Sequence, residues 1–372
     1  MELEQRLWAA MRACPASVLP APRLTPSEAF AELAVASAEL GVDEWDQYGE
    51  RGAVARVEAE VAELLGKPGA VFFPSGVMGQ QAALRSWCDR TGSRRVAIPD
   101  RSHLLVHEDD GPRLLHDFRF EHLTVGRRTA TAADLRGLPA GLGAVLVELP
   151  LRDAGCRLPS WEELSELSAA ARELGVPLHV DGARLWESQP FYDRPLDEIA
   201  ALADTVYVSF YKGLGGPAGA AVAAPADLAG ELRSWRRRMG GTLFRMTPYA
   251  VGALVGLRDL LPRMGEYAAW ARELAAELAA AGFTVDPDPP QTNTFLVHAP
   301  VDPDAVNERL AAFMERERIA PSGAWWASAV PGMATTEFAV QSGSLGFEPA
   351  QVARWWAELV ETPQDQAGSS IR

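Results

Sequence analysis

The sequence predicts an α/β fold with a large, mostly parallel sheet covered by helices on both faces, followed by a smaller α+β domain. Three observations predict it. Continuous apolar runs, typical of strands buried on both faces, occur within residues 43–250. Amphipathic helical segments separate these runs, and such β-α-β alternation is typical of parallel sheets. From about Pro248 the sequence pattern changes and predicts long helices rich in Ala, Leu and Arg, with short strands between them.

The first 42 residues are expected to form a helix and an extended arm. Residues 2–14 have a helical pattern. The proline-rich stretch that follows, CPASVLPAPRLTP, favours extended backbone because a residue before proline avoids the helical region.

Residues 43–250 are expected to form the large domain. A helix that ends at a Gly66–Pro68 stop precedes its first strand. A second helix has Ser160 as N-cap and Glu163 at the capping-box position. The stretch from about 101 to 140 looks less regular. Strands are expected at 70–73, 94–100, 143–150, 176–184, 204–212 and 218–225.

Residues 251–362 are expected to form the small C-terminal domain, and residues 363–372 a disordered tail. The elements expected from Pro248 onward are helices at 249–262, 264–281, 302–318 and 350–361 and strands at 283–286, 293–299 and 336–342.

Composition excludes several classes of protein. The 372 residues carry a formal net charge of −15, which argues against a nucleic-acid or anionic-membrane partner. No window approaches the ~20 apolar residues of a membrane-spanning helix. The N-terminus lacks a secretory pattern, and the three cysteines are far apart with no CxxC, so we expect a cytoplasmic protein.

Common cofactor motifs are also missing. The glycine-rich stretch 213–219 lies between two expected strands and opens no helix, so it is not a dinucleotide fingerprint. His103 and His107 are four residues apart, but they have no HExxH frame and no obvious third ligand. We therefore expect no metal.

Two strand ends carry the residues that suggest chemistry. Asp181 follows one buried strand and Lys212, one of only two lysines, follows another. At the carboxyl ends of parallel strands they could hold pyridoxal phosphate, with the lysine as Schiff base and the carboxylate on the pyridinium nitrogen. Their spacing alone is equally compatible with a structural ion pair. The turn PSGVMG adds a helix N-terminus at Gly76 that would attract a phosphate.

Together with PLHVDGARLWES, SFYKGLGGPAG and SWRRRMGGTLFRMTPYA, these residues resemble the threonine aldolase and β-eliminating lyase family of fold-type-I pyridoxal-phosphate enzymes. The resemblance runs from about residue 43 to 282. It implies the fold-type-I transferase-like fold with a seven-stranded sheet, and a homodimer or homotetramer with shared active sites. Lys212, His103 and Asp181 are the implied catalytic residues. The implied cofactor contacts are Lys212, Asp181, Arg184, His103, Ser75, Gly76, Val77, Ser209, Arg238 and Arg245, and the implied substrate contacts are Arg184, Tyr48 and Glu337.

The sequence departs from the family at the substrate side. The family's RSDTVT-type opening reads APRLTPSEAF, and its ENTH block reads Glu148-Leu149-Pro150-Leu151, without the histidine. Glu337 aligns with a family arginine that binds the α-carboxylate, although it could instead be a solvated strand residue. A glutamate would repel that carboxylate.

The leading expectation is therefore a lyase that cleaves or forms the Cα–Cβ bond of a β-hydroxy-α-amino acid, as threonine aldolases do. The alternative is a pyridoxal-phosphate enzyme with a rebuilt substrate site, acting by β-elimination, racemisation or transamination on a modified amino acid or amine. A non-catalytic relative of the same fold is the third.

Overall fold

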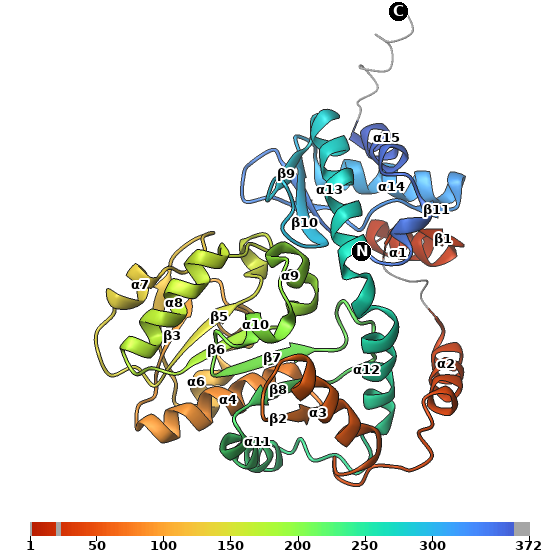
Figure 1. Ribbon diagram of the computed structural model, residues 1–372. Helices are drawn as coiled ribbons and strands as arrows, with labels where there is room; N and C mark the ends of the chain where they lie inside the picture. The colour runs from red at the N-terminus through yellow and green to blue at the C-terminus, as the bar shows by residue number, and fades with distance from the viewer. Residues whose placement is uncertain (1, 20–23, 361–372) are drawn as a thin grey trace, which may run out of the picture. The chain divides into compact units, whose positions relative to one another are not determined.

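The computed structural model describes residues 2–19 and 24–360, which form two compact units. The large unit spans Pro26–Met264, and the small unit joins the N-terminal segment to the chain from Gly265 onward (Figure 1).

The large unit is built on a seven-stranded sheet with the order β2-β8-β7-β6-β5-β3-β4. Four of the six neighbouring pairs are parallel, and β8 runs antiparallel to both β2 and β7. The predicted large, mostly parallel sheet is confirmed. Its strands are β2 (Gly69–Phe73), β3 (Arg95–Pro99), β4 (Arg119–Thr124), β5 (Ala144–Glu148), β6 (Leu178–Gly182), β7 (Thr205–Ser209) and β8 (Ala220–Ala224).

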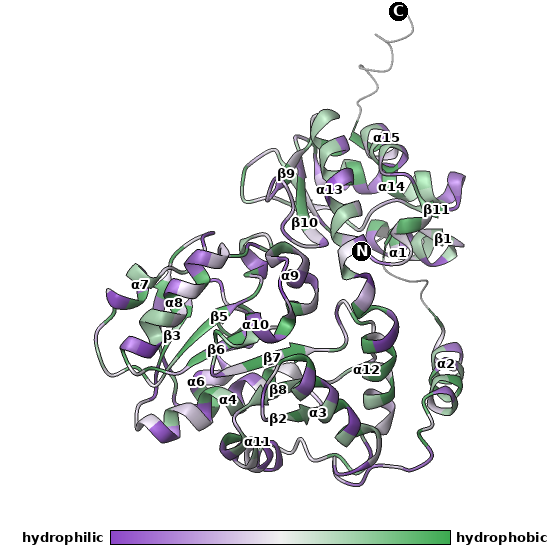
Figure 2. Cartoon of the chain, in the orientation of Figure 1, coloured by the Kyte–Doolittle hydropathy of each residue, from purple (hydrophilic) through white to green (hydrophobic). Residues whose placement is uncertain are grey.

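Helices cover both faces of this sheet. Leu146 of β5 packs in a core cluster with residues of α4, whereas Val147, which points to the opposite face, lies with Leu164 and Leu167 of α8. The helices show both hydrophilic and hydrophobic colour, as expected of elements that bury one side (Figure 2). They are α2 (Pro26–Glu39), α3 (Gly52–Leu64), α4 (Gly76–Thr91), α5 (His103–Val106), α6 (Gly111–His116), α7 (Ala132–Arg136), α8 (Trp161–Glu173), α9 (Leu185–Tyr192), α10 (Leu196–Ala200), α11 (Ala226–Arg238) and α12 (Thr247–Asp259), with 3₁₀ turns η1 (Arg152–Ala154) and η2 (Leu261–Arg263).

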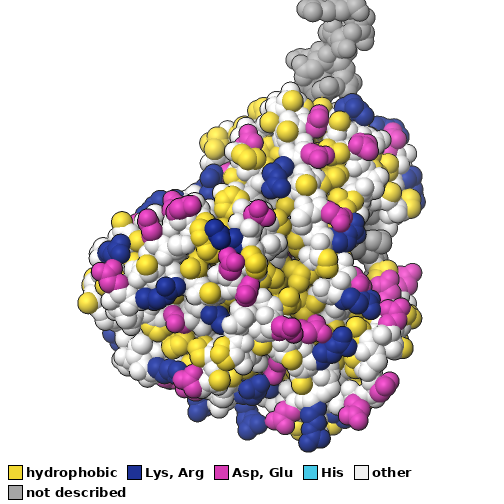
Figure 3. Space-filling model, viewed as in Figure 1, with side chains coloured by type: hydrophobic (Ala, Val, Ile, Leu, Met, Phe, Trp, Pro, Cys, Tyr) yellow, Lys and Arg dark blue, Asp and Glu magenta, His cyan; other side chains and the backbone are white. Residues whose placement is uncertain are grey.

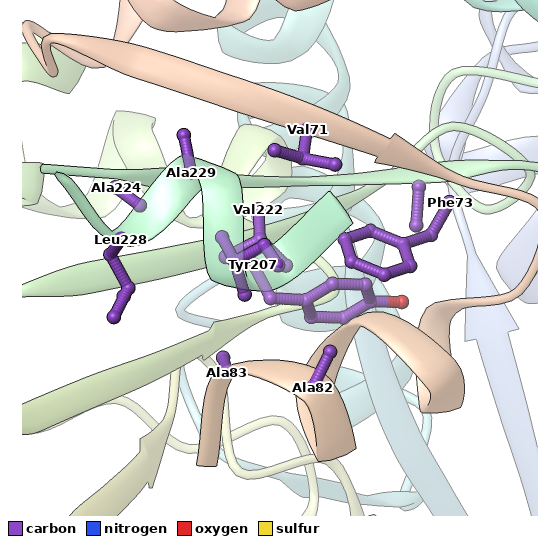
Figure 4. Packing of buried hydrophobic residues seen from close by; sticks show 11 residues of the cluster. Val71, Phe73, Ala82, Ala83, Tyr207, Val222, Ala224, Leu228 and Ala229 are labelled. Carbon is purple, nitrogen blue, oxygen red and sulfur yellow. The ribbon is translucent and has the colours of Figure 1, made fainter. Parts of the chain in front are cut away.

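One core cluster fixes α4 and α11 against β2, β8 and β7. Val71, Val222 and Tyr207 of the strands meet Ala82 of α4 and Leu228 of α11, all of them buried (Figure 4). Tyr207 and its neighbours therefore face α4, and this face of the sheet carries the residues described below.

The small unit contains a four-stranded sheet with the order β12-β13-β10-β9 and a two-stranded parallel pair, β1 with β11. The α+β character expected of the C-terminal part is confirmed. Its elements are α1 (Glu2–Ala13), β1 (Ala16–Ser17), α13 (Met264–Ala280), β9 (Thr284–Asp286), β10 (Thr294–Ala299), α14 (Pro303–Glu317), β11 (Ile319–Ala320), β12 (Trp326–Ala327), β13 (Ala334–Ala339), η3 (Ser344–Gly346) and α15 (Pro349–Val360).

The structure corrects the expected arm. Residues 26–39 form helix α2 instead of extended chain, because a proline at the first helical position fits a helix start. Helix α1 belongs to the small unit and α2 to the large one, so the first 42 residues are not one region. The two units meet at Met264, later in the chain than the predicted boundary at 250. Residues 20–23 of the arm and the predicted tail at 363–372 lie outside the described residues.

The stretch from about residue 101 to 140 has more regular structure than the sequence predicts. It contains strand β4 and three short helices. Strand β4 lies at the sheet edge, where its first four residues are exposed or half-buried, so its sequence shows no continuous apolar run.

Acidic and basic side chains are interspersed on the face seen in Figure 3. No helix among the described residues combines the length and the apolar character needed to cross a membrane.

Candidate active site

The ends of three neighbouring strands bring polar residues together. Asp181, on β6, is directly opposite Glu148 of β5 and Tyr207 of β7 in the sheet register. Residues paired in this way point to the same face, which here is the face covered by α4. The sheet therefore builds a row of polar groups beneath the N-terminal part of α4.

Asp181 is held at both oxygens. The Gln80 side chain, from α4, donates a hydrogen bond of 2.7 Å to Oδ2, and the backbone N–H of Ala183 donates one of 2.9 Å to Oδ1. The side chain is buried, and burial raises the pKa of this carboxyl while the nearby Lys212 opposes the rise. A fixed, buried carboxylate of this kind favours a cationic partner.

Lys212 lies in the link between β7 and β8. Burial lowers the pKa of its ammonium group, and the charge of Asp181 is the largest effect that opposes the change. The link is tightly packed, because a Cβ at Gly213 would lie 2.3 Å from Oε1 of the buried Glu187. The two residues that the sequence singled out thus influence each other within one buried site. A lysine amine with a lowered pKa is a better nucleophile at neutral pH.

Arg184 and Ser209 lie beside this pair. Nη1 of Arg184 is 3.8 Å from Oε1 of Glu187, and the charge of Arg184 also acts on Lys212. The Ser209 hydroxyl donates a hydrogen bond of 2.7 Å to the Ala183 carbonyl, which ties the end of β7 to the loop that follows Asp181. Sequence reasoning did not single out Glu187, although it lies inside one of the resembling blocks.

Helix α4 begins at Gly76, above the row of polar strand-end residues. In the described part of the chain, the Ser75 hydroxyl makes no capping bond, so the first-turn N–H groups, which include that of Val77, are left for another acceptor. Gly76 is required by close packing, since a Cβ there would lie 2.0 Å from the Tyr207 hydroxyl. This fits the predicted phosphate turn.

His103, the first residue of α5, contacts the same row of polar groups. Its backbone N–H donates a hydrogen bond of 2.7 Å to Oε1 of Glu148, and its Nε2 is 2.8 Å from Oε1 of Glu108. Burial, with help from the charge of Lys212, lowers the pKa of His103 to about 4. The imidazole is therefore neutral at neutral pH.

Comparison with known proteins identifies the family of this chain. The family model for β-eliminating lyases matches residues 25–301. The chain belongs to the β-eliminating lyase family.

Two solved structures are similar to this family member over nearly its whole length. One, from Listeria monocytogenes and provisionally named an L-allo-threonine aldolase, is 34% identical with a TM-score of 0.89 and covers 96% of this chain and 99% of its own. The other, from Exiguobacterium sp. 255-15 and provisionally named an aromatic amino acid β-eliminating lyase/threonine aldolase, is 34% identical with a TM-score of 0.88 and covers 95% and 98%. Low-specificity L-threonine aldolase 1 of Arabidopsis thaliana is 29% identical over 251 residues, 64% of this chain and 68% of the relative.

Tyr48 and Arg245 lie together at an exposed rim of the large unit. The Tyr48 and Phe244 rings are 5.3 Å apart, and Arg245 lies 4.2 Å from the Phe244 ring. Asp46, which sequence reasoning missed, holds this rim by accepting hydrogen bonds of 2.7 Å from the backbone N–H groups of Met246 and Thr247. The rim residues line a hollow of about 700 Å³ together with Arg51 and Arg237, among others.

The remaining predicted residues lie elsewhere. Arg238 is exposed on the last turn of α11, with its guanidinium 4.6 Å from the Trp235 ring. Glu337 belongs to the small unit, where it is half-buried on β13 opposite Leu296 of β10. Glu337 is therefore only partly in contact with solvent, and its contact with the substrate stays a prediction.

Proposed function

We propose that this chain is a pyridoxal-phosphate-dependent lyase that cleaves or forms the Cα–Cβ bond of β-hydroxy-α-amino acids such as threonine. The observation that carries the proposal is the interaction of the buried Asp181 with the partly buried Lys212 beyond neighbouring strand ends, below the open N-terminus of α4. The names of the similar proteins, which include threonine aldolases, support it.

The residues present fit the cofactor. The first turn of α4, at Ser75, Gly76 and Val77, would hold its phosphate, and Lys212 would hold its aldehyde carbon. Asp181 would hold the protonated ring nitrogen, since both its oxygens are already oriented by Gln80 and Ala183. When bound, the cofactor supplies an electron sink for the pair of electrons released at Cα.

The chain's own residues supply the remaining steps. Burial lowers the pKa of Lys212, so its amine gives up a proton more readily than an exposed lysine does and can take it back during the reaction. Arg184 is the cation beside Lys212 and would orient the substrate carboxylate. His103, neutral above a pKa of about 4, can accept a proton from the substrate hydroxyl.

We also propose that two copies of the chain share their active sites, with Tyr48, Arg245 and Arg238 reaching the partner's cofactor. The exposure of Tyr48 and the arginine-lined hollow beside it support this. Mixing an inactive Lys212→Ala protein with an inactive Arg245→Ala protein should restore activity, because one site of the mixed dimer would be complete. A mixture without activity, shown by light scattering to contain mixed dimers, would contradict the proposal that the two chains share their active sites.

The cytoplasmic location expected from the sequence stays a prediction.

The activity is tested with the cofactor-loaded protein and L-threonine or L-allo-threonine. We expect glycine and acetaldehyde in equal amounts, and none from the Lys212→Ala variant. Lys67 is the only other lysine, and its ammonium group donates to the Ala203 carbonyl, so Lys67→Ala is the matched control that should keep activity. A loaded protein that releases ammonia and a keto acid instead would favour the β-elimination alternative.

A further inference from the structure

A histidine–carboxylate pair lies at the two ends of helix α5, with His103 as its first residue and Glu108 just beyond its end. Nε2 of His103 lies 2.8 Å from Oε1 of Glu108, and both side chains are partly buried. The charge of Lys212 acts on the pKa of each of them, so both are near the reacting lysine. Glu108 has no role in the resemblance and none in the proposed function above.

The His103 ring is fixed from a second side. The His107 ring lies 4.9 Å from it, tilted by 37°, and Nε2 of His107 is 2.6 Å from Oδ2 of Asp153. Arg152 in turn holds Asp153 with a hydrogen bond of 3.0 Å. Since Glu148 also accepts the His103 backbone N–H, ring and backbone are both held in place.

The contact with Glu108 determines which ring nitrogen carries the proton. A neutral imidazole has one N–H and one lone pair, and a carboxylate can only accept. His103 is neutral at neutral pH because burial and the charges of Lys212 and His107 lower its pKa. Nε2 therefore carries the proton and donates it in the hydrogen bond to Glu108, and the lone pair is on Nδ1.

We propose that Glu108 is a positioning residue that keeps the His103 proton on Nε2, so that Nδ1 of His103 takes the proton of the substrate's β-hydroxyl group. This rests on the proposed function. As Nδ1 binds that proton, the O–H electron pair forms the aldehyde C=O bond, the Cα–Cβ bond breaks, and its electron pair remains on Cα until Cα is protonated. Atoms and charge balance without any further reactant.

The proton position is tested first in the cofactor-free protein. Histidine ¹⁵N spectra of the six histidines are recorded at neutral pH, and His103→Gln identifies the His103 signals. We expect the Nε2–H form in the wild type and in Glu108→Gln, whose amide oxygen still accepts, and a mixture of both forms in Glu108→Ala. Asp109→Asn, a change at the neighbouring acidic residue, should leave the signals unchanged. A wild-type His103 in the Nδ1–H form would overturn the proposal.

The catalytic part is tested with the loaded protein and L-threonine. Glu108→Ala should lower kcat about tenfold to a hundredfold with KM changed less than threefold, and Glu108→Gln should regain part of the loss. An unchanged kcat in Glu108→Ala would overturn the proton-transfer role. If the wild type itself releases no acetaldehyde, the proposed function fails and with it the transfer role, while the tautomer spectra still decide the positioning role of Glu108.

Discussion

The strand-end floor of the site and the exposed rim of the large unit at Tyr48 and Arg245 are built in different ways. At the floor, Asp181 and Glu148 come from adjacent strands and are buried, and each accepts a hydrogen bond from a neighbouring element. At the rim, Tyr48 is about half exposed and Arg245 is partly buried on a loop. The buried Asp46 accepts hydrogen bonds from the backbone N–H groups of their chain neighbours Gly49 and Met246. Groups whose charge must be controlled lie on the rigid sheet, and groups suited to recognition lie on loops, which vary more easily.

The largest effect is expected at the floor. Asp181→Asn keeps the shape of the side chain but removes the charge that would pair with the cofactor's ring nitrogen. We expect turnover of the loaded protein to fall by ~10²–10³-fold, which is the range found when one preorganised group is removed. The melting temperature should change little, because a buried charge is lost together with its desolvation cost. A less than threefold loss of turnover would show that the floor does not control charge as described.

Substitution of Asp46 should lower the free energy of unfolding far more than substitution of the exposed rim residues. Asp46→Ala leaves the N–H groups of Gly49, Met246 and Thr247 without their acceptor. Each buried unsatisfied donor costs ~1–3 kcal/mol, so we expect the free energy of unfolding to fall by about 3 kcal/mol in urea denaturation. A loss of ~0.5 kcal/mol or less would show that the rim does not depend on this residue.

Glu148, at the floor, should make the stability of the protein depend on pH. Burial and the neighbouring charge of Asp181 raise the pKa of Glu148 to about 8. The folded state then binds more protons than the unfolded state between the usual value near 4.5 and pH 8, so stability falls as pH rises through that window. We expect the wild type to lose about 1 kcal/mol per pH unit near neutrality relative to Glu148→Gln, measured by urea denaturation at a series of pH values. Parallel pH profiles for the two proteins would contradict this.

The smallest effect is expected at Arg238. The guanidinium of this exposed arginine lies 4.6 Å from the Trp235 ring, and cation–π contacts at exposed sites contribute ~0.5–1 kcal/mol. Arg238→Ala should lower the free energy of unfolding by no more than that. Arg238→Lys should restore part of it, because an ammonium group can also lie over the ring. A destabilisation comparable to that of Asp46→Ala would show that α11 depends on this arginine.

Sequence reasoning found the floor but not its supports. Asp181 and Lys212 follow apolar runs whose burial on both faces is easily recognised, so their position at strand ends could be predicted. Gln80 and Glu108 act through contacts with residues distant in sequence or within an irregular loop. A single sequence carries no signal for such contacts, because they depend on how the sheet and α4 pack.

The fold shows the same division. Inner strands such as β5 and β6 are continuous apolar runs and were predicted, whereas the edge strand β4 mixes polar and apolar residues and was not. Helix α2 was not predicted, because it begins at the last proline of a proline-rich stretch. The structural capping box of α8 was predicted, since Ser160 and Glu163 make both expected bonds.

Peptide mapping after borohydride reduction tests most directly whether Lys212 carries the cofactor. The protein is loaded with pyridoxal phosphate, reduced and digested, and the mass of the attached group is sought on the peptides that contain Lys212 and Lys67. We predict the label on Lys212 in the wild type and in Lys67→Ala, and its loss in Lys212→Ala together with the visible absorption band. Label on Lys67 alone, or a protein that takes up no cofactor, would contradict the account.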